Sequence, residues 1–167
     1  MGPPSIAVRR AEARDAEAIR AIYNREVERS TVTFDMVPRS GEEQLAWIAE
    51  HAGPYPAIVA VDHDETVLGF ASLSPYRPRP AYATTVENSV YVHEDARGKG
   101  VGSLLMKELV EIAAANGFHS IIARISGDHD ASIALHAAAG FTVIGREREV
   151  GRKLGRWLDV VLMQRML

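Results

Sequence analysis

The chain has 167 residues, of which 47% are hydrophobic, and a formal net charge of −3 from 19 Lys and Arg against 22 Asp and Glu. This length predicts one domain with its own core, and the near balance of charge excludes a global basic field of the kind that recruits nucleic acid. The lack of cysteine excludes disulfides and thiolate sites and fits a reducing compartment.

Membrane attachment and secretion are not indicated by the sequence. No hydrophobic run approaches the roughly 18 residues of a membrane span. Residues 1–6 lack the apolar centre of a signal peptide. We therefore expect a cytoplasmic protein that forms a single domain over residues 1–167.

The first third of the chain predicts a strand, a helix and a loop. Residues 6–9 form a short strand candidate. Asp15 can cap a helix whose apolar residues recur at helical spacing as far as Ser30. Residues 31–35 are rich in β-branched side chains, but they are too few and too close to Pro38 for a strand, so a loop is expected.

A second helix and a hairpin follow. Ser40 and Glu43 have the spacing of a capping box that opens this helix. Its apolar residues are Leu45, Trp47 and Ile48. The strand-like runs at residues 57–61 and 67–73 are joined by a short polar segment, which predicts an antiparallel hairpin.

The centre of the chain predicts a strand over residues 83–93 that leads through a glycine-rich loop into a helix. The apolar face of that helix comprises Val101, Leu104, Leu105, Leu109, Ile112 and Ala113. Asn116 and Gly117 have the composition of a helix C-terminus.

The last third predicts three strands around a short helix. Residues 120–125 are nearly all apolar, which is typical of a strand covered on both faces. Asp128 or Asp130 can cap the helix that follows. Residues 141–150 and 157–166 then predict two strands joined by a loop. The whole order is β-α-α-β-β-β-α-β-α-β-β, an α/β fold.

The glycine-rich loop has the pattern Arg97-x-x-Gly100-x-Gly102 directly after a strand. A loop that opens a helix presents free backbone N–H groups and the positive end of the helix dipole, so it suits a phosphate. The dinucleotide fingerprint does not fit, because Ser103 or Leu105 stands where its third glycine is needed, and no Gly-Lys-Ser/Thr of a P-loop is present. A plain turn with a basic flank remains the alternative.

This loop resembles the pyrophosphate loop of the GNAT superfamily of N-acetyltransferases, which binds acetyl-coenzyme A. The resemblance implies a single-domain fold with a mixed sheet of about seven strands and about four helices. It also implies acetyl-coenzyme A contacts from the strand, the loop and a later residue, at Val90, Tyr91, Val92, Arg97, Gly98, Lys99, Gly100, Val101, Gly102, Ser103 and His129.

A second superfamily motif, Asn-x-x-Ala/Ser-x-x-x-Tyr-x-x-x-Gly-Phe, matches with two departures. His129 replaces the Asn, and His136 replaces the Tyr. His136 followed by Gly140-Phe141 resembles the phosphinothricin and methionine sulfone/sulfoximine N-acetyltransferases. Residues 30–34, 85–92 and 155–164 resemble the same branch.

The expected chemistry needs a base, because an amino-acid amine is largely protonated at neutral pH and is nucleophilic only when neutral. Glu87 is the candidate, since a carboxylate partly buried among Val86, Val90 and Tyr91 has a raised pKa. The alternative is a solvated strand residue or an ion-pair partner of an arginine. Backbone N–H groups near Tyr91 or Val92 are candidate oxyanion donors. His136 is a candidate acid for the leaving thiolate, or a structural histidine.

Substrate contacts are expected from the segment before the central strand. Arg77 and Arg79 flank Pro78, and a planar guanidinium suits carboxylate, sulfone or phosphinate oxygens. A solvated loop is the alternative, above all for Arg79. Further candidates for the substrate pocket are Phe34, Tyr82, Thr85 and Val86.

The resemblance thus implies an acetyl-coenzyme A dependent N-acetyltransferase of a small amine, and a homodimer. Two other functions stay open: an acyl-coenzyme A sensor without turnover, and an acetyltransferase of protein N-termini or lysines. None of the six histidines forms an i, i+4 pair on a predicted helix, so no metal site is expected.

Overall fold

The structure is a computed structural model that describes residues 5–167. The prediction that no signal peptide opens the chain falls mainly on residues 1–4, which lie outside the described residues. The α-helices and strands follow in the predicted order: β1 (Ala7–Arg10), α1 (Ala16–Arg29), α2 (Gly41–Glu50), β2 (Ala57–Val61), β3 (Val67–Pro75), β4 (Thr85–Val92), α3 (Val101–Ala115), β5 (Ser120–Ser126), α4 (Asp130–Ala138), β6 (Thr142–Lys153) and β7 (Arg156–Met166).

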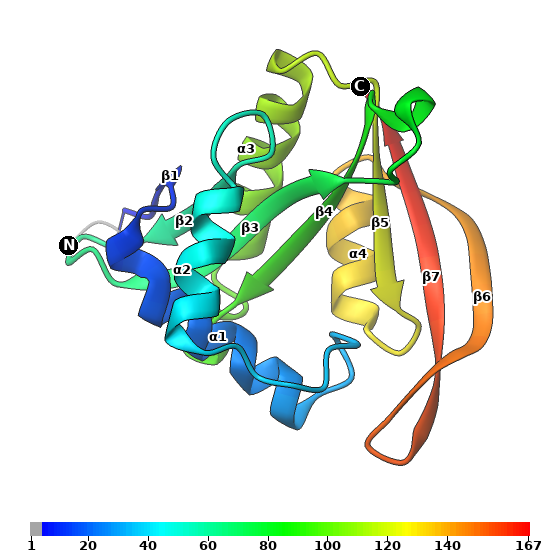
Figure 1. Cartoon of the computed structure of the whole chain (residues 1–167), viewed down its shortest axis with the longest axis horizontal. Helices are drawn as coiled ribbons and strands as arrows, with labels where there is room; N and C mark the ends of the chain where they lie inside the picture. The colour runs from blue at the N-terminus through cyan, green and yellow to red at the C-terminus, as the bar shows by residue number, and fades with distance from the viewer. Residues whose placement is uncertain (1–4) are drawn as a thin grey trace.

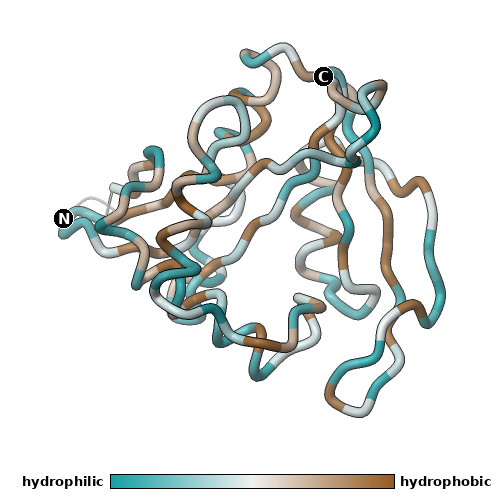
Figure 2. Tube along the Cα trace, in the orientation of Figure 1, coloured by the Kyte–Doolittle hydropathy of each residue, from teal (hydrophilic) through white to brown (hydrophobic). Residues whose placement is uncertain are grey.

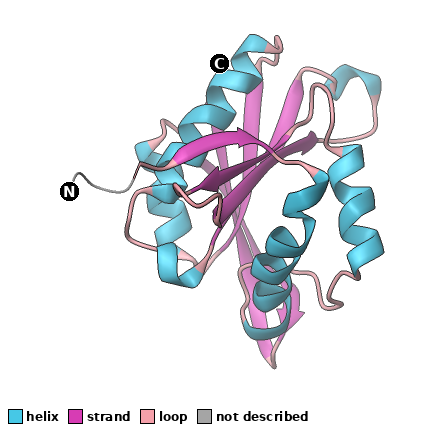
Figure 3. Cartoon of the chain, turned by 90° about the vertical axis from the view of Figure 1, so that its left-hand side faces the viewer, coloured by secondary structure: helices cyan, strands magenta, loops and turns pink. Residues whose placement is uncertain are grey.

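The strands form one mixed seven-stranded sheet in the order β1-β2-β3-β4-β5-β7-β6 (Figure 1). All neighbouring strands are antiparallel except β4 and β5, which are parallel. Helices cover both sides of the sheet (Figure 3). The β2–β3 hairpin and the loop over residues 31–35 are confirmed.

The core has two parts, one on each face of the sheet. On one face, α3 packs Leu105 and Leu109 against the central strands. On the other face, α1 packs Ile19 and Ile22 against β2 and β3. Figure 2 shows hydrophobic stretches along these elements and in the middle of β7. Of the helices in residues 5–167, none combines the length and hydrophobicity needed to cross a bilayer.

Two helices bury faces that differ slightly from the predicted ones. In α2, Leu45 is 50% exposed, and its neighbour Gln44 is fully buried. In α3, Leu104 is 40% exposed, and Met106 and Val110 lie in the core. The hydrophobic pattern does not predict the burial of the polar Gln44, and the position of each helix on the sheet decides which side chains turn inward.

The helix starts confirm one predicted cap and correct two. Ser40 Oγ accepts from Glu43 N–H at 3.1 Å, and Glu43 Oε2 accepts from Ser40 N–H at 2.7 Å, which is the predicted capping box. Asp15 makes no cap bond to α1. Residue 129 occupies the N-cap of α4 without a side-chain bond, so neither Asp128 nor Asp130 caps it.

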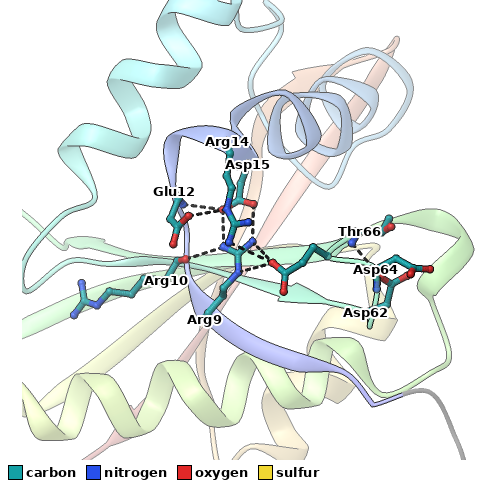
Figure 4. A network of polar contacts seen from close by, with 9 residues as sticks. Arg9, Arg10, Glu12, Arg14, Asp15, Asp62, Asp64 and Thr66 are labelled. Carbon is teal, nitrogen blue, oxygen red and sulfur yellow. Dashed lines mark hydrogen bonds and ion pairs between the residues drawn. The ribbon is translucent and has the colours of Figure 1, made fainter.

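Asp15 instead belongs to an ion-pair network at one end of the sheet (Figure 4). Arg9 donates to both carboxylate oxygens of Asp15, at 2.8 and 3.0 Å, and also reaches Glu65. Asp15 also accepts from Glu12 N–H at 2.7 Å. Desolvation is the largest single effect on the buried Asp15 carboxyl, and it raises the pKa. The bonds from Arg9 and Glu12 together outweigh it, so the pKa of Asp15 lies below its usual value.

The last hairpin is longer than predicted. Residues 151–153 belong to β6, where a loop was expected, and the turn is only Leu154-Gly155. Both have positive φ, at 50° and 74°. This is typical of a two-residue hairpin turn, which suits the twist of its strands. The hairpin projects beyond the rest of the sheet (Figure 1).

Candidate active site

The sheet opens in its middle, where β4 and β5 diverge (Figure 1). These two strands pair only through Thr85–Ser120, Val86–Ile121 and Glu87–Ile122. Beyond Glu87, β3 is the one strand of the described residues that pairs with β4. The second half of β4 therefore has one free edge.

The backbone groups along this edge have a definite direction. His93 N–H donates to Leu68 O at 2.8 Å, toward β3, and Thr84 O accepts from His119 N–H at 2.8 Å, toward β5. Because backbone direction alternates along a strand, Val90 and Val92 present their N–H and C=O groups to the opening, and Tyr91 faces β3. Of the two predicted oxyanion donors, Val92 has the suitable direction.

A cleft of about 590 Å³ runs along this edge to the start of α3. The cleft brings together most of the residues predicted to bind a cofactor. Those that line it are Val90, Tyr91, Val92, Arg97, Gly98, Gly100, Val101, Gly102, Ser103 and His129. Lys99 is not part of this lining, and its Nζ donates to Asp95 O at 2.7 Å.

The glycine loop leaves the start of α3 open. Gly100, the N-cap residue, has φ of 81°, and a Cβ built on it would meet no atom of the described residues within 4 Å. No side chain of residues 5–167 caps the helix, so its first N–H groups are free to bind an anion. Gly102 is different, because its Cβ would touch Leu135 at 3.3 Å. Gly102 therefore serves helix packing, and the open position is Gly100.

Arg97 reaches from this loop to α1. Its guanidinium lies 2.6 Å from Glu26 Oε1. Glu26 is buried at one wall of the cleft, where it also accepts from Ser30 Oγ. A cation at the mouth of the cleft is thus already oriented by a carboxylate.

Glu87 is the last β4 residue paired to β5, at the point where the strands separate. Its side chain is half-buried, and within residues 5–167 neither an ion pair nor a hydrogen bond engages its carboxylate. Burial raises the pKa of Glu87, and the positive charge of Arg124 partly opposes this rise. The site thus contains an unpaired carboxylate whose basicity is increased.

A smaller pocket of about 50 Å³ continues the cleft between the two diverging strands. The two share five lining residues: Val32, Val90, Tyr91, His129 and Ser132. His136 lies in its wall with 4% exposure. Its Nδ1 is 2.7 Å from Ser132 O, and its Nε2 is 3.0 Å from Asn88 Nδ2.

With the Asn88 amide oriented as it is here, these contacts correspond to a neutral His136. A carbonyl only accepts, so Nδ1 carries the proton and donates to Ser132 O. An amide nitrogen only donates, so Nε2 accepts from Asn88. Burial lowers the pKa of His136, which agrees with a neutral ring. Burial also lowers the pKa of His129.

None of the seven residues predicted to contact the substrate lines either pocket: Phe34, Arg77, Arg79, Tyr82, Thr85, Val86 and Glu87. Arg77 stacks over the rings of Tyr76 and Tyr82, at 4.9 and 5.6 Å from their centroids, on the exposed loop that carries Arg79. Phe34 packs against Gly151 of β6 and so connects the loop after α1 to the last hairpin.

The two strand residues before Glu87 differ from the expectation. Thr85 Oγ1 is 3.2 Å from Ser120 Oγ, which connects the paired parts of β4 and β5. Val86 is fully buried in the core under α3. Its side chain therefore faces away from any ligand on the Glu87 face, and only its backbone is near the opening.

Three polar residues of the site carry no signal in the sequence. Asn88 lies between Glu87 and Ser89, Arg124 lies between two apolar strand residues, and Glu26 lies in an ordinary helix. Their importance comes from pairing across distant segments.

Among residues 5–167, one group of possible metal ligands lies outside the site, at Asp62, His63 and Asp64 in the β2–β3 turn. Asp62 Oδ1 accepts from the backbone N–H groups of Asp64 and Thr66. These bonds shape the turn (Figure 4) and account for the acidic residue there.

Comparison with known proteins agrees with this geometry. The family model described as "Acetyltransferase (GNAT) domain" matches residues 8–162. The chain is 42% identical to a phosphinothricin N-acetyltransferase of Streptomyces coelicolor, over 99% of each chain. It is also 42% identical to an L-methionine sulfoximine/L-methionine sulfone acetyltransferase of Pseudomonas aeruginosa, over 96% of this chain and 94% of the relative.

A solved structure gives the same result. The phosphinothricin acetyltransferase of Sinorhizobium meliloti, crystallised with acetyl-CoA, is 42% identical to this chain and superposes with a TM-score of 0.93. The match covers 97% of this chain and 88% of that one. The chain therefore belongs to the GNAT family of acetyltransferases.

Proposed function

We propose that this protein is an acetyl-CoA-dependent N-acetyltransferase that acts on the α-amine of a small amino-acid-like substrate. The observation that carries the proposal is the opening between β4 and β5, with the unpaired Glu87 carboxylate at its origin and the uncapped start of α3 along the cleft. The names of the relatives support phosphinothricin, methionine sulfone and methionine sulfoximine as the substrate type.

The residues of the cleft fit acetyl-CoA. The free N–H groups at the start of α3, together with Arg97, suit its pyrophosphate. The free edge at Val90 and Val92 suits the amide groups of its pantetheine arm, because an extended chain can pair with an open strand edge. When the pyrophosphate binds, Arg97 either leaves Glu26 for the phosphate oxygens or contacts both groups at once.

Replacing Gly100 by Val should weaken acetyl-CoA binding at least tenfold, which is about 1.4 kcal/mol. The new side chain enters the open space at the N-terminus of α3 and also strains a backbone with φ of 81°. Isothermal titration of acetyl-CoA measures the change. Gly53→Val is the matched control, since Gly53 has φ of 79° and equal open space but lies in a distant turn. If both variants bind acetyl-CoA like the wild type, the phosphate assignment is wrong.

Proton transfer is the part of the reaction that Glu87 performs. When bound, acetyl-CoA supplies an acetyl group as a thioester that a neutral amine attacks. Glu87 takes the proton of the substrate ammonium group, directly or through a water, and burial makes its carboxylate more basic. The N–H group of Val92 faces the opening and can stabilise negative charge on the carbonyl oxygen.

His136 is better suited to positioning than to acid catalysis. The Asn88 amide donates to a neutral Nε2, so protonation of the ring would require this amide to turn and offer its Oδ1, which is buried here without a partner among the described residues. We therefore assign to His136 the role of fixing Asn88 and α4 at the wall of the smaller pocket. The pH dependence of kcat tests this assignment. If His136 were the acid, kcat would fall at alkaline pH as the ring loses its proton, and His136→Gln would remove that fall.

An amine panel tests the function as a whole. The wild type should release CoA thiol fastest with methionine sulfone, methionine sulfoximine or phosphinothricin, and slowly with polyamines or a peptide N-terminus. Tight acetyl-CoA binding without turnover on any amine would favour the sensor. A preference for peptides or lysines would favour the protein acetyltransferase.

We also propose a cytoplasmic homodimer. Exposed hydrophobic side chains gather on β6 and β7, where Val143, Ile144, Val150 and Trp157 are all more than half exposed. Such residues on a long edge strand favour association. Light scattering should give about twice the chain mass of 18.3 kDa, and a monomer at micromolar concentration would contradict the dimer. The cysteine-free composition fits the cytoplasm, which cell fractionation checks.

A further inference from the structure

Arg124 lies in the wall of the smaller pocket, on the strand that diverges from the strand of Glu87. Glu87 is paired with Ile122 across the sheet. Because side chains alternate along a strand, Arg124 projects from the same face as Glu87 and Ile122, one full repeat beyond the pair. Along the strand, Arg124 therefore lies about 7 Å from Ile122, the residue that pairs with Glu87.

The contacts of Arg124 leave most of its guanidinium available. It forms an ion pair with Glu147 Oε1 at 3.3 Å, and the region that the structure describes offers it no hydrogen bond. Glu147 Oε1 is itself buried without a hydrogen-bond partner, so the two groups attract each other but are not aligned. A guanidinium has five N–H donors, and here they border a pocket.

The charge of Arg124 reaches the reacting end of the site, since it opposes the rise of the Glu87 pKa. An arginine beside a catalytic base has a cost, because it makes the base weaker. A position that only connected strands would not need a cation there. A ligand carboxylate bound near Glu87 would neutralise the positive charge of Arg124.

We propose that Arg124 binds the α-carboxylate of the substrate and so makes the enzyme selective for α-amino acids over simple amines. This deepens the proposed function and rests on it. An α-amino acid carries its amine and its carboxylate on one carbon, so a base and an arginine on neighbouring strands can bind both. The pocket of about 50 Å³ suits such a small polar head group. Arg77 is then free to contact the oxygens of the side chain.

The test compares two substrates that differ only in the carboxylate: L-methionine sulfone and 3-(methylsulfonyl)propylamine. Arg124→Ala should lower kcat/KM for methionine sulfone about 10- to 100-fold, the size of a lost hydrogen bond to a charged group. For the amine the change should stay below about threefold. The Kd of acetyl-CoA should not change. Arg124→Gln replaces Arg124→Ala if the latter lowers Tm.

Two further variants separate this role from a structural one. Glu147→Gln removes the ion pair and keeps the guanidinium, so kcat/KM for methionine sulfone should stay equal or rise. Arg146→Ala removes a nearby arginine that pairs with Asp159, and it should leave both substrates unaffected.

Three results would overturn the inference. Equal losses for both substrates in Arg124→Ala would mean that no carboxylate is bound there. Equal losses in Glu147→Gln and Arg124→Ala would mean that the ion pair is structural. A wild type that does not acetylate methionine sulfone or any α-amino acid would instead overturn the proposed function, on which the inference rests.

Discussion

Glu87→Gln is expected to lower kcat by about 10²- to 10⁴-fold, the usual contribution of general base catalysis. The substitution keeps the size of the side chain and removes its ability to take a proton. Glu87 has no partner among residues 5–167, so no ion pair is lost and the fold should be unchanged. Acetyl-CoA binding should also be unchanged, because the cleft lining does not include Glu87.

The pH dependence gives a second measurement of the same role. In the wild type, kcat/KM should fall at acidic pH as Glu87 is protonated, and burial moves this fall to a higher pH than that of a solvated carboxylate. The variant should lose that limb. Glu111→Gln changes an exposed carboxylate of α3 and is the control. Near wild-type turnover of Glu87→Gln from pH 6 to 9 would show that the base lies elsewhere.

Local signals in the sequence predicted the order of the elements correctly. The capping box of Ser40 and Glu43 and the C-terminal Asn116-Gly117 of α3 involve neighbours in the chain, so spacing alone reveals them. The cap at Asp15 was wrong because Arg9, on another element, competes for the same carboxylate. A distant partner of this kind leaves no trace in a local pattern.

The same distinction between local patterns and distant partners holds for the candidate site. The glycine loop and the strand before it form one continuous segment, and their residues do line one cleft. Arg124 and Asn88 were missed because their contacts depend on the register between β4, β5 and α4. Register follows from how whole strands pack, so a single strand gives no information about which residue of a neighbour it will face.

The separation of the strands is the feature that no residue specifies alone. Thr85 and Ser120 join their hydroxyl groups where β4 and β5 are paired. Beyond Glu87, the gap is lined by polar and apolar residues of both strands, by Val32 from the loop after α1, and by residues at and within α4. The opening therefore results from the packing of several segments, and it explains why a strand that reads as continuous in the sequence lines a cleft along its second half.

Arg77→Ala is expected to lower kcat/KM for methionine sulfone or phosphinothricin by ~1.5–3 kcal/mol, the cost of losing a hydrogen bond to a charged group. Arg77 is exposed, but it is not randomly placed. Tyr76 and Tyr82 meet edge to face at 5.5 Å between ring centroids, and the guanidinium lies over both rings. Cation–π contacts of this kind fix the direction of the guanidinium and leave its edges free for oxygens.

The substrate comparison shows whether those oxygens are its ligands. Wild type and Arg77→Ala are assayed with methionine sulfone and with norleucine, which keeps the α-amino acid head group and lacks the sulfonyl oxygens. The loss should be large for the sulfone and small for norleucine, and Arg77→Lys should restore part of it, because a lysine keeps the charge without the planar pair of donors. Equal losses for both substrates would mean that Arg77 only supports the loop. Arg124 is proposed to bind the carboxylate that both substrates carry, so Arg124→Ala should lower kcat/KM for methionine sulfone and for norleucine alike. Arg77→Ala should lower it mainly for methionine sulfone, and this difference distinguishes the two arginines.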